Sequence, residues 1–137
     1  MSIKALAHVC ICTKDLKATE EFYCKILGFE KVFEFKKNGQ TTGFYLKISD
    51  SNFLEFFLDP RNYSNDSPLR HLCFETDDIK ALREDLISKG INCTETILGG
   101  DASWQFWIKD PNGIDIEFHQ YTENSSQKTK QPVLMTW

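Results

Sequence analysis

The stretches Ala7-His8-Val9-Cys10 and Arg70-His71-Leu72-Cys73 decide the fold, because the sequence around the first is repeated around the second. His71 follows His8 by 63 positions (71 − 8). Each histidine is followed by a glutamate, Glu55 in Phe53-Leu54-Glu55-Phe56-Phe57 and Glu117 in Asp115-Ile116-Glu117-Phe118-His119, and the glutamates are 62 positions apart (117 − 55). Spacings that agree to within one residue indicate an internal repeat.

Each repeat has the pattern of one strand, one helix and three further strands. Asp15 is placed to cap a helix that ends at Gly28, and Asp77 or Asp78 to cap one that ends at Gly90. Alternating apolar residues predict strands at 3–13, 29–35, 43–48 and 53–58, and again at 69–75, 91–98, 104–109 and 114–121. The sequence therefore predicts an α+β fold of two tandem βαβββ modules.

The module boundaries follow from turn-forming residues. We place module one at 3–58, a linker rich in Pro, Asn and Ser at 59–68, and module two at 69–121. Together they form a single domain, residues 1–122. The polar residues 123–137 are predicted to be a loose tail, although the apolar ending Val133-Leu134-Met135-Thr136-Trp137 is suited to docking.

The composition restricts the class of protein. A chain of 137 residues with 41% apolar and 26% charged residues is typical of one globular domain. The net charge of −4 and the lack of a basic run argue against a nucleic-acid partner. We find no signal peptide and no membrane-spanning run, and the five cysteines include no C-x-x-C pair. We therefore expect a cytoplasmic protein with reduced thiols and no membrane partner.

The repeated histidines and glutamates raise a chemical question, because all four lie among apolar residues within strands. Burying a carboxylate is costly unless it binds a metal, pairs with a cation or holds a proton. A single strand histidine is more often a hydrogen-bonded core residue, and a single strand glutamate usually faces water. Finding both types at both equivalent positions favours a metal site, and this mixed ligand set suits Zn, Ni, Co, Fe or Mn.

The paired modules, each opening on a histidine and closing on a glutamate, resemble the vicinal oxygen chelate superfamily. Phe22-Tyr23 before Leu27-Gly28-Phe29 is similar to a helix end in that family. Asp110-Pro111-Asn112-Gly113 before Ile116-Glu117 is similar to its closing motif, although Ile114 stands where the family usually has Asn. The resemblance covers residues 3 to about 121 and implies a curved, partly open eight-stranded sheet around a metal site.

The number of metal ligands that the resemblance implies distinguishes between the enzyme activities of this superfamily. Dioxygenases of the family would use His8, His71 and Glu117, with Fe or Mn. Glyoxalase I and methylmalonyl-CoA epimerase have a fourth ligand, and Glu55 occupies its position. The resemblance thus implies a glyoxalase I-like lyase or isomerase with Ni, Co or Zn, in which the metal stabilises an enediolate. Glu117 would be the catalytic base and Glu55 a ligand or second proton carrier.

Several alternatives stay open at this stage. The enzyme could instead be epimerase-like or an extradiol-type dioxygenase, and a bleomycin-resistance-like protein would bind a small molecule without metal. We expect a small-molecule substrate and a homodimer. Candidate substrate contacts are Arg61, Arg70, Phe44, Trp104 and Phe106, although surface solubility explains the arginines equally well and aromatic strand residues are first of all core. Cys10, Cys12 and Cys73 share faces with the histidines, which allows a sulfur-rich metal site, but we interpret them first as small core residues. His119 is either a support for a ligand or a strand end near solvent.

Overall fold

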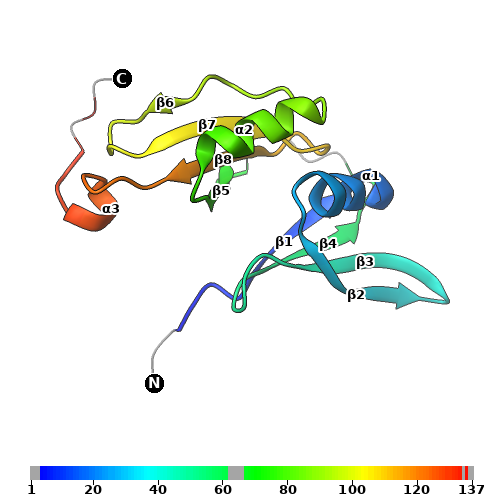
Figure 1. The fold of residues 1–137 in the computed structure, drawn as a ribbon. Coiled ribbons are helices and arrows are strands. Elements are labelled where there is room, and N and C mark those ends of the chain that lie inside the picture. The colour runs from blue at the N-terminus through cyan, green and yellow to red at the C-terminus, as the bar shows by residue number, and fades with distance from the viewer. Residues whose placement is uncertain (1–3, 62–66, 134, 136–137) are drawn as a thin grey trace. The chain divides into compact units, whose positions relative to one another are not determined.

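The computed structural model describes residues 4–61, 67–133 and 135. The chain divides into two compact units, Met1–Ser67 and Pro68–Trp137, and each contains one four-stranded sheet (Figure 1). The predicted linker falls partly on residues 62–66, and the predicted apolar ending partly on residues 134, 136 and 137, which are outside the described ranges. No helix in the described ranges is long and apolar enough to cross a membrane.

The first unit has its sheet strands in the order β1-β4-β3-β2. Its elements are β1 (His8–Thr13), α1 (Leu16–Glu20), η1 (Glu21–Ile26), β2 (Glu30–Lys37), β3 (Gln40–Lys47) and β4 (Phe53–Leu58). β1 runs parallel to β4, and this register places Cys10 opposite Glu55. The other neighbouring pairs are antiparallel.

The second unit repeats this topology, with the order β5-β8-β7-β6. Its elements are β5 (His71–Glu75), α2 (Ile79–Ser88), β6 (Ile97–Leu98), β7 (Trp104–Lys109), β8 (Asp115–Gln120) and α3 (Ser126–Thr129). β5 is parallel to β8 and places Cys73 opposite Glu117, as Cys10 lies opposite Glu55. The predicted tandem βαβββ fold is confirmed, with the eight strands forming two mixed sheets.

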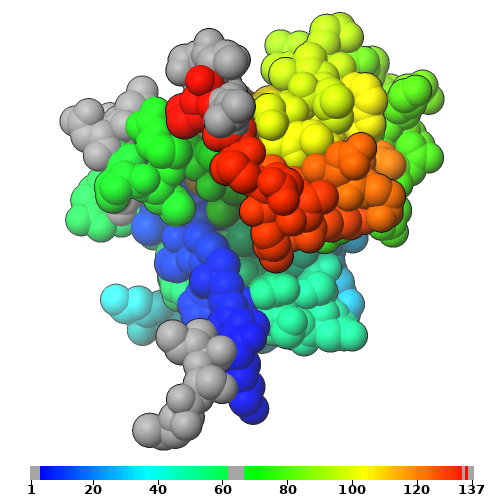
Figure 2. Space-filling model, turned by 90° about the vertical axis from the view of Figure 1, so that its left-hand side faces the viewer, coloured from blue at the N-terminus to red at the C-terminus, as the bar shows by residue number. Residues whose placement is uncertain are grey.

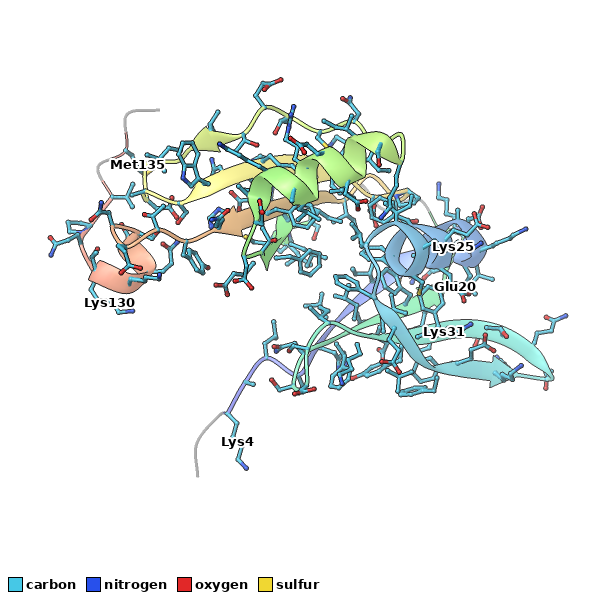
Figure 3. All side chains as sticks on the ribbon, viewed as in Figure 1. Lys4, Glu20, Lys25, Lys31, Lys130 and Met135 are labelled. Carbon is cyan, nitrogen blue, oxygen red and sulfur yellow. The ribbon has the colours of Figure 1, made fainter. Side chains whose placement is uncertain are left out.

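Aspartate caps begin the two main helices, as the sequence predicts. The Asp15 carboxylate accepts a hydrogen bond from the Ala18 backbone N–H at 3.0 Å, and Asp78 accepts one from Ala81 at 3.0 Å. The first helix changes after Glu20 into the π-helical segment η1. Lys31 joins this helix to the neighbouring β2, since its Nζ lies 2.7 Å from carboxylate oxygens of both Glu20 and Glu34 (Figure 3).

Each sheet has one apolar face that packs with the helix of its own unit. In the first unit the buried residues include Tyr23, Phe44, Leu46, Leu54 and Phe56, and in the second Ile79, Leu86, Phe106, Ile108, Ile116 and Phe118. Full burial of one such side chain contributes about 1.5–3 kcal/mol. Because strand side chains alternate, the histidines and glutamates of the repeat lie on the opposite face of each sheet.

Two predicted segments differ from the structure. The strand predicted at 91–98 is reduced to β6, because Thr94 pairs irregularly with Trp107: its hydroxyl accepts from the Trp107 backbone N–H at 2.8 Å, and its own N–H donates to the Trp107 carbonyl at 3.0 Å. The Thr94 hydroxyl thus takes the place of a backbone carbonyl in the regular hydrogen-bond pattern between the strands.

The prediction of a loose tail at residues 123–137 is also wrong for the first part of that segment. The Ser125 hydroxyl donates to the Ala102 carbonyl at 3.0 Å, and the Gln127 amide donates to Asp101 Oδ2 at 2.7 Å. Ser103 and Ser125 are fully buried against each other. Figure 2 shows the orange and red C-terminal segment lying against the yellow segment near residue 100. Polar pairing, rather than apolar burial, holds this segment in place.

Candidate metal centre

The first unit brings His8 of β1 and Glu55 of β4 together on one sheet face. His8 Nε2 lies 3.8 Å from Glu55 Oε1. The glutamate side chain is largely buried, with 17% exposed, whereas 40% of the His8 side chain is exposed. A histidine nitrogen and a carboxylate oxygen are therefore side by side, and the imidazole remains accessible from solvent.

Tyr45 of β3 supports His8 and was missed in the sequence. Its hydroxyl lies 3.2 Å from His8 Nδ1, and its ring stacks on Phe33 and Phe53 at centroid distances of 4.7 and 5.2 Å. A hydrogen bond to one imidazole nitrogen orients the other toward a ligand. Tyr45 lies directly opposite Glu55 in the antiparallel register, so alternation along β3 was the available signal.

The second unit repeats this arrangement with His71 of β5 and Glu117 of β8. His71 Nε2 lies 3.3 Å from Glu117 Oε2. Trp107 of β7 packs edge-on against the His71 ring at 4.8 Å, and it occupies the position opposite Glu117 that Tyr45 has opposite Glu55. Each half of the repeat thus holds a histidine, a glutamate and an aromatic ring that contacts the histidine.

His119 adds a feature that the first unit lacks. It is 8% exposed, so the prediction of a solvent-exposed strand end is wrong. Its Nε2 lies 2.8 Å from Glu117 Oε1, and its Nδ1 lies 3.9 Å from Asp101 Oδ2. Burial raises the pKa of Asp101, but hydrogen bonds from Gln127 and Ser103 outweigh this effect and leave its pKa lowered. Asp101 therefore holds a negative charge beside the imidazole.

The cysteines opposite the glutamates lie on the glutamate faces of the sheets. Burial, followed by the hydrogen bond to Glu55 and its charge, raises the pKa of Cys10 to about 11. Burial and the charge of Glu117 raise the pKa of Cys73 to about 12. Both thiols are protonated at neutral pH. Their interpretation as core residues is wrong, since both are partly open to solvent.

We call His8 with Glu55 the first half-site and His71 with Glu117 the second half-site. The residues of the second half-site fit a divalent cation. Glu117 is 7% exposed, and its ion-pair partners in the described part of the chain are the imidazoles of His71 and His119 rather than a lysine or arginine. A buried carboxylate needs a compensating positive charge. Imidazole nitrogens beside a carboxylate are a ligand set suited to Zn, Ni, Co, Fe or Mn.

The predicted substrate contacts do not gather on the glutamate faces. Phe44 and Phe106 are 1% and 0% exposed and lie in the cores, stacked on Phe56 and Phe118. Their placement does not support a substrate contact, because the alternation of the strand turns both rings away from the glutamates. Trp104 lies on the same side of β7 as Phe106 and is 40% exposed.

The two arginines differ in their surroundings. The Arg61 guanidinium Nη2 lies 2.6 Å from Asp59 Oδ2, so its charge is paired locally. Arg70 directly precedes β5 and is exposed. It directly precedes His71 and is therefore, of the predicted substrate residues, the one nearest in sequence to a predicted metal ligand.

Known proteins resemble this chain over most of its length. The uncharacterized protein YaeR of Escherichia coli (strain K12) is 27% identical in a 127-residue alignment that covers 88% of this chain and 98% of YaeR. The iron-dependent extradiol dioxygenase of Rhodococcus jostii (strain RHA1) is 30% identical in a 131-residue alignment that covers 84% of this chain and 42% of the dioxygenase. The crystal structure of the glyoxalase family protein from Enterococcus faecalis has a TM-score of 0.75 and 28% identity, with 87% of this chain and 99% of that chain covered.

A protein-family model matches both halves of the repeat. The model of the glyoxalase, bleomycin resistance protein and dioxygenase superfamily matches residues 5–118. The match includes both histidines and both glutamates of the repeat, and members of this superfamily share the tandem βαβββ fold. The chain therefore belongs to the Glyoxalase/Bleomycin resistance protein/Dioxygenase superfamily.

Proposed function

We propose that the protein is a metal-dependent isomerase or lyase of the glyoxalase I type, which moves a proton next to a carbonyl group. One divalent ion would be held by His8, Glu55, His71 and Glu117. The observation that carries the proposal is the second glutamate. Glu55 accompanies His8 as Glu117 accompanies His71, at 3.8 and 3.3 Å.

The charges of the four side chains suit such an ion. Two carboxylates balance a divalent charge, and two neutral imidazoles add donors without changing it. When bound, the ion would polarise the substrate oxygens and stabilise the negative charge that develops during proton transfer. Ni, Co or Zn fit this nitrogen and oxygen set. Tyr45 and Trp107 hold the two histidine rings in place.

Glu117 is our assignment for the catalytic base. Its side chain is 10% exposed, and histidine nitrogens lie close to both of its oxygens, so its carboxylate is fixed in position and shielded from water. It would take the proton from the carbon beside the carbonyl and return it to the neighbouring atom, which leaves the protein unchanged. Glu55, with 17% exposed, would serve as a ligand or second proton carrier.

The other assignments follow the same chemistry. A small-molecule substrate fits a half-site whose histidine is 40% exposed in one unit and 41% in the other. Arg70 is a candidate for binding an anionic substrate group because it adjoins His71 and is exposed. We also propose a homodimer, and mixing tagged and untagged chains followed by affinity capture tests it directly.

An extradiol-type dioxygenase is the second candidate, favoured by the similarity to the Rhodococcus jostii enzyme. It would use His8, His71 and Glu117 with Fe or Mn and would leave Glu55 outside the ligand set. A fourth protein ligand leaves fewer open positions for dioxygen and a catechol together. The partly buried Glu55 beside His8 therefore favours proton transfer.

The test is a reaction screen of the full chain loaded separately with Ni, Co, Zn, Fe or Mn. Hemithioacetals, acyl-CoA epimers and catechols serve as substrates, and solvent deuterium entering the product reports proton transfer. Glu117→Gln should abolish turnover and Glu55→Gln should reduce it. Glu95→Gln is the control, since this exposed residue pairs with Arg83 and is none of the four proposed ligands. Oxygen uptake with catechols and no deuterium entry would replace isomerisation by the dioxygenase reaction.

A further inference from the structure

The second unit contains a second donor set, which overlaps the four-ligand site at one residue. Cys73, Glu117 and His119 each offer one ligand atom, and these atoms lie within 4.8 Å of one another. The parallel register places Cys73 opposite Glu117, and His119 lies two residues farther along the same face of β8. The set combines sulfur, oxygen and nitrogen and shares only Glu117 with the proposed isomerase site.

An unsatisfied nitrogen points into this set. His119 is 92% buried, by its 8% exposure, and its Nε2 has no hydrogen-bond partner among the described residues. That nitrogen nevertheless lies 2.8 Å from Glu117 Oε1, at an angle unsuited to a hydrogen bond. A buried donor or acceptor left unpaired has a free-energy cost. An ion bound by both atoms would remove that cost.

A carboxylate lies near the other nitrogen of this imidazole. Asp101 Oδ2 lies 3.9 Å from His119 Nδ1, on the side away from Glu117. Asp101 is itself fixed by the Ser103 backbone N–H at 3.0 Å and by the Gln127 amide at 2.7 Å. A carboxylate beyond the ligand is a common support for metal-binding histidines.

The first unit supplies an internal comparison. Cys10 lies opposite Glu55 as Cys73 lies opposite Glu117. The position two residues after Glu55, however, is Phe57, whose ring packs on Phe35 at 4.6 Å. The first unit therefore has the sulfur and the oxygen but no imidazole at the position equivalent to His119. Among the described residues, the complete set occurs in the second unit alone.

We propose that Cys73 Sγ, a carboxylate oxygen of Glu117 and Nε2 of His119 bind a thiophilic divalent ion such as Zn²⁺ or Cd²⁺. Water completes a four-coordinate shell. On binding, the sulfur–metal bond forms as the Cys73 thiol proton leaves to solvent, without any change of oxidation state. Thiolate ligands favour these ions over Mg²⁺ and Ca²⁺. The inference does not depend on the proposed isomerase, but an ion here would occupy its base, Glu117, and inhibit it.

The test is a Co²⁺ titration of the full chain, followed by the near-ultraviolet charge-transfer band of thiolate-bound cobalt. The band should appear in the native chain and in Cys10→Ser, and should be lost in Cys73→Ser. His119→Phe, which copies the residue of the first unit, should weaken Co²⁺ binding at least about tenfold. His8→Ala should leave the band unchanged, because His8 belongs only to the four-ligand site.

Three outcomes would overturn the inference. These are no thiolate band in the native chain, a band that survives in Cys73→Ser, or a band that depends equally on Cys10. Cadmium-113 NMR of the native chain reads sulfur coordination without any substitution, so a Cys73→Ser variant that fails to fold does not block the test. Turnover with Ni²⁺ in a chain without the thiolate band would retain the proposed function and remove only this inference.

Discussion

Replacing Tyr45 by Phe removes one hydroxyl and leaves its ring in place. The ring stacks on Phe33 and Phe53 through its faces, so Phe at this position retains both contacts. What is lost is the hydrogen bond to His8 Nδ1, at 3.2 Å. The substitution therefore isolates the orientation of one proposed metal ligand.

The expected magnitude follows from that single bond. A hydrogen bond of this kind contributes about 0.5–1.5 kcal/mol net, and about 1.4 kcal/mol corresponds to a tenfold change in affinity. Because the bond is exposed to solvent, we expect the lower half of this range. Metal affinity should fall by about two- to fivefold, and the free energy of unfolding of the metal-free protein should fall by no more than about 0.5–1 kcal/mol.

The assay is a competition titration of Ni²⁺ against a chelating dye, with thermal unfolding of the metal-free protein alongside it. Tyr121→Phe is the matched control. Its ring contacts His119 edge-on at 5.9 Å, and its hydroxyl bonds none of the four proposed ligands within the described residues. An unchanged affinity in Tyr45→Phe, or an equal loss in Tyr121→Phe, would refute the role assigned to Tyr45.

Three further predictions concern stability. The lowered pKa of Asp101 stabilises the fold above the unfolded value of about 3.9, and this contribution is lost as pH falls through the folded pKa. Asp101→Asn should therefore be less stable than the native chain in urea at pH 7, and the difference should shrink as pH falls through the pKa of folded Asp101. Gly43→Ala would make a Cβ clash with the Phe56 carbonyl oxygen and should lower the free energy of unfolding by about 1–3 kcal/mol in chemical denaturation. Phe106→Ala should lower the free energy of unfolding by about 3–5 kcal/mol but leave the KM of the folded enzyme unchanged. A raised KM would instead support the substrate contact predicted for Phe106.

The repeat explains why so much of the fold could be predicted. Because the pattern occurs twice, each strand of the module is indicated at two places in the sequence. The aspartate caps at Asp15 and Asp78 are local features that can be recognised directly in the sequence. The two-residue period of the strands also separated His8 and Glu55 from the core face. Local periodicity and internal similarity were sufficient for these features.

The features that were missed depend on contacts between distant residues. The burial of His119 arises from packing around Asp101 and the C-terminal segment, which its own strand does not reveal. The same contacts order the segment around Ser125, whose polar composition indicated a loose tail. Thr94 ends the regular pairing of β6 and β7 by using its side chain as an acceptor, and no sequence period signals that choice.

The proposed function requires that His8, Glu55, His71 and Glu117 bind one and the same ion. Ni²⁺ bound per chain, measured by equilibrium dialysis in a Cys73→Ser background, tests it most directly. We predict one tightly bound ion in that background, and its loss in His8→Ala, in His71→Ala and in the double variant alike. Two ions, one removed by each single substitution, or tight binding that survives in either histidine variant, would contradict the account.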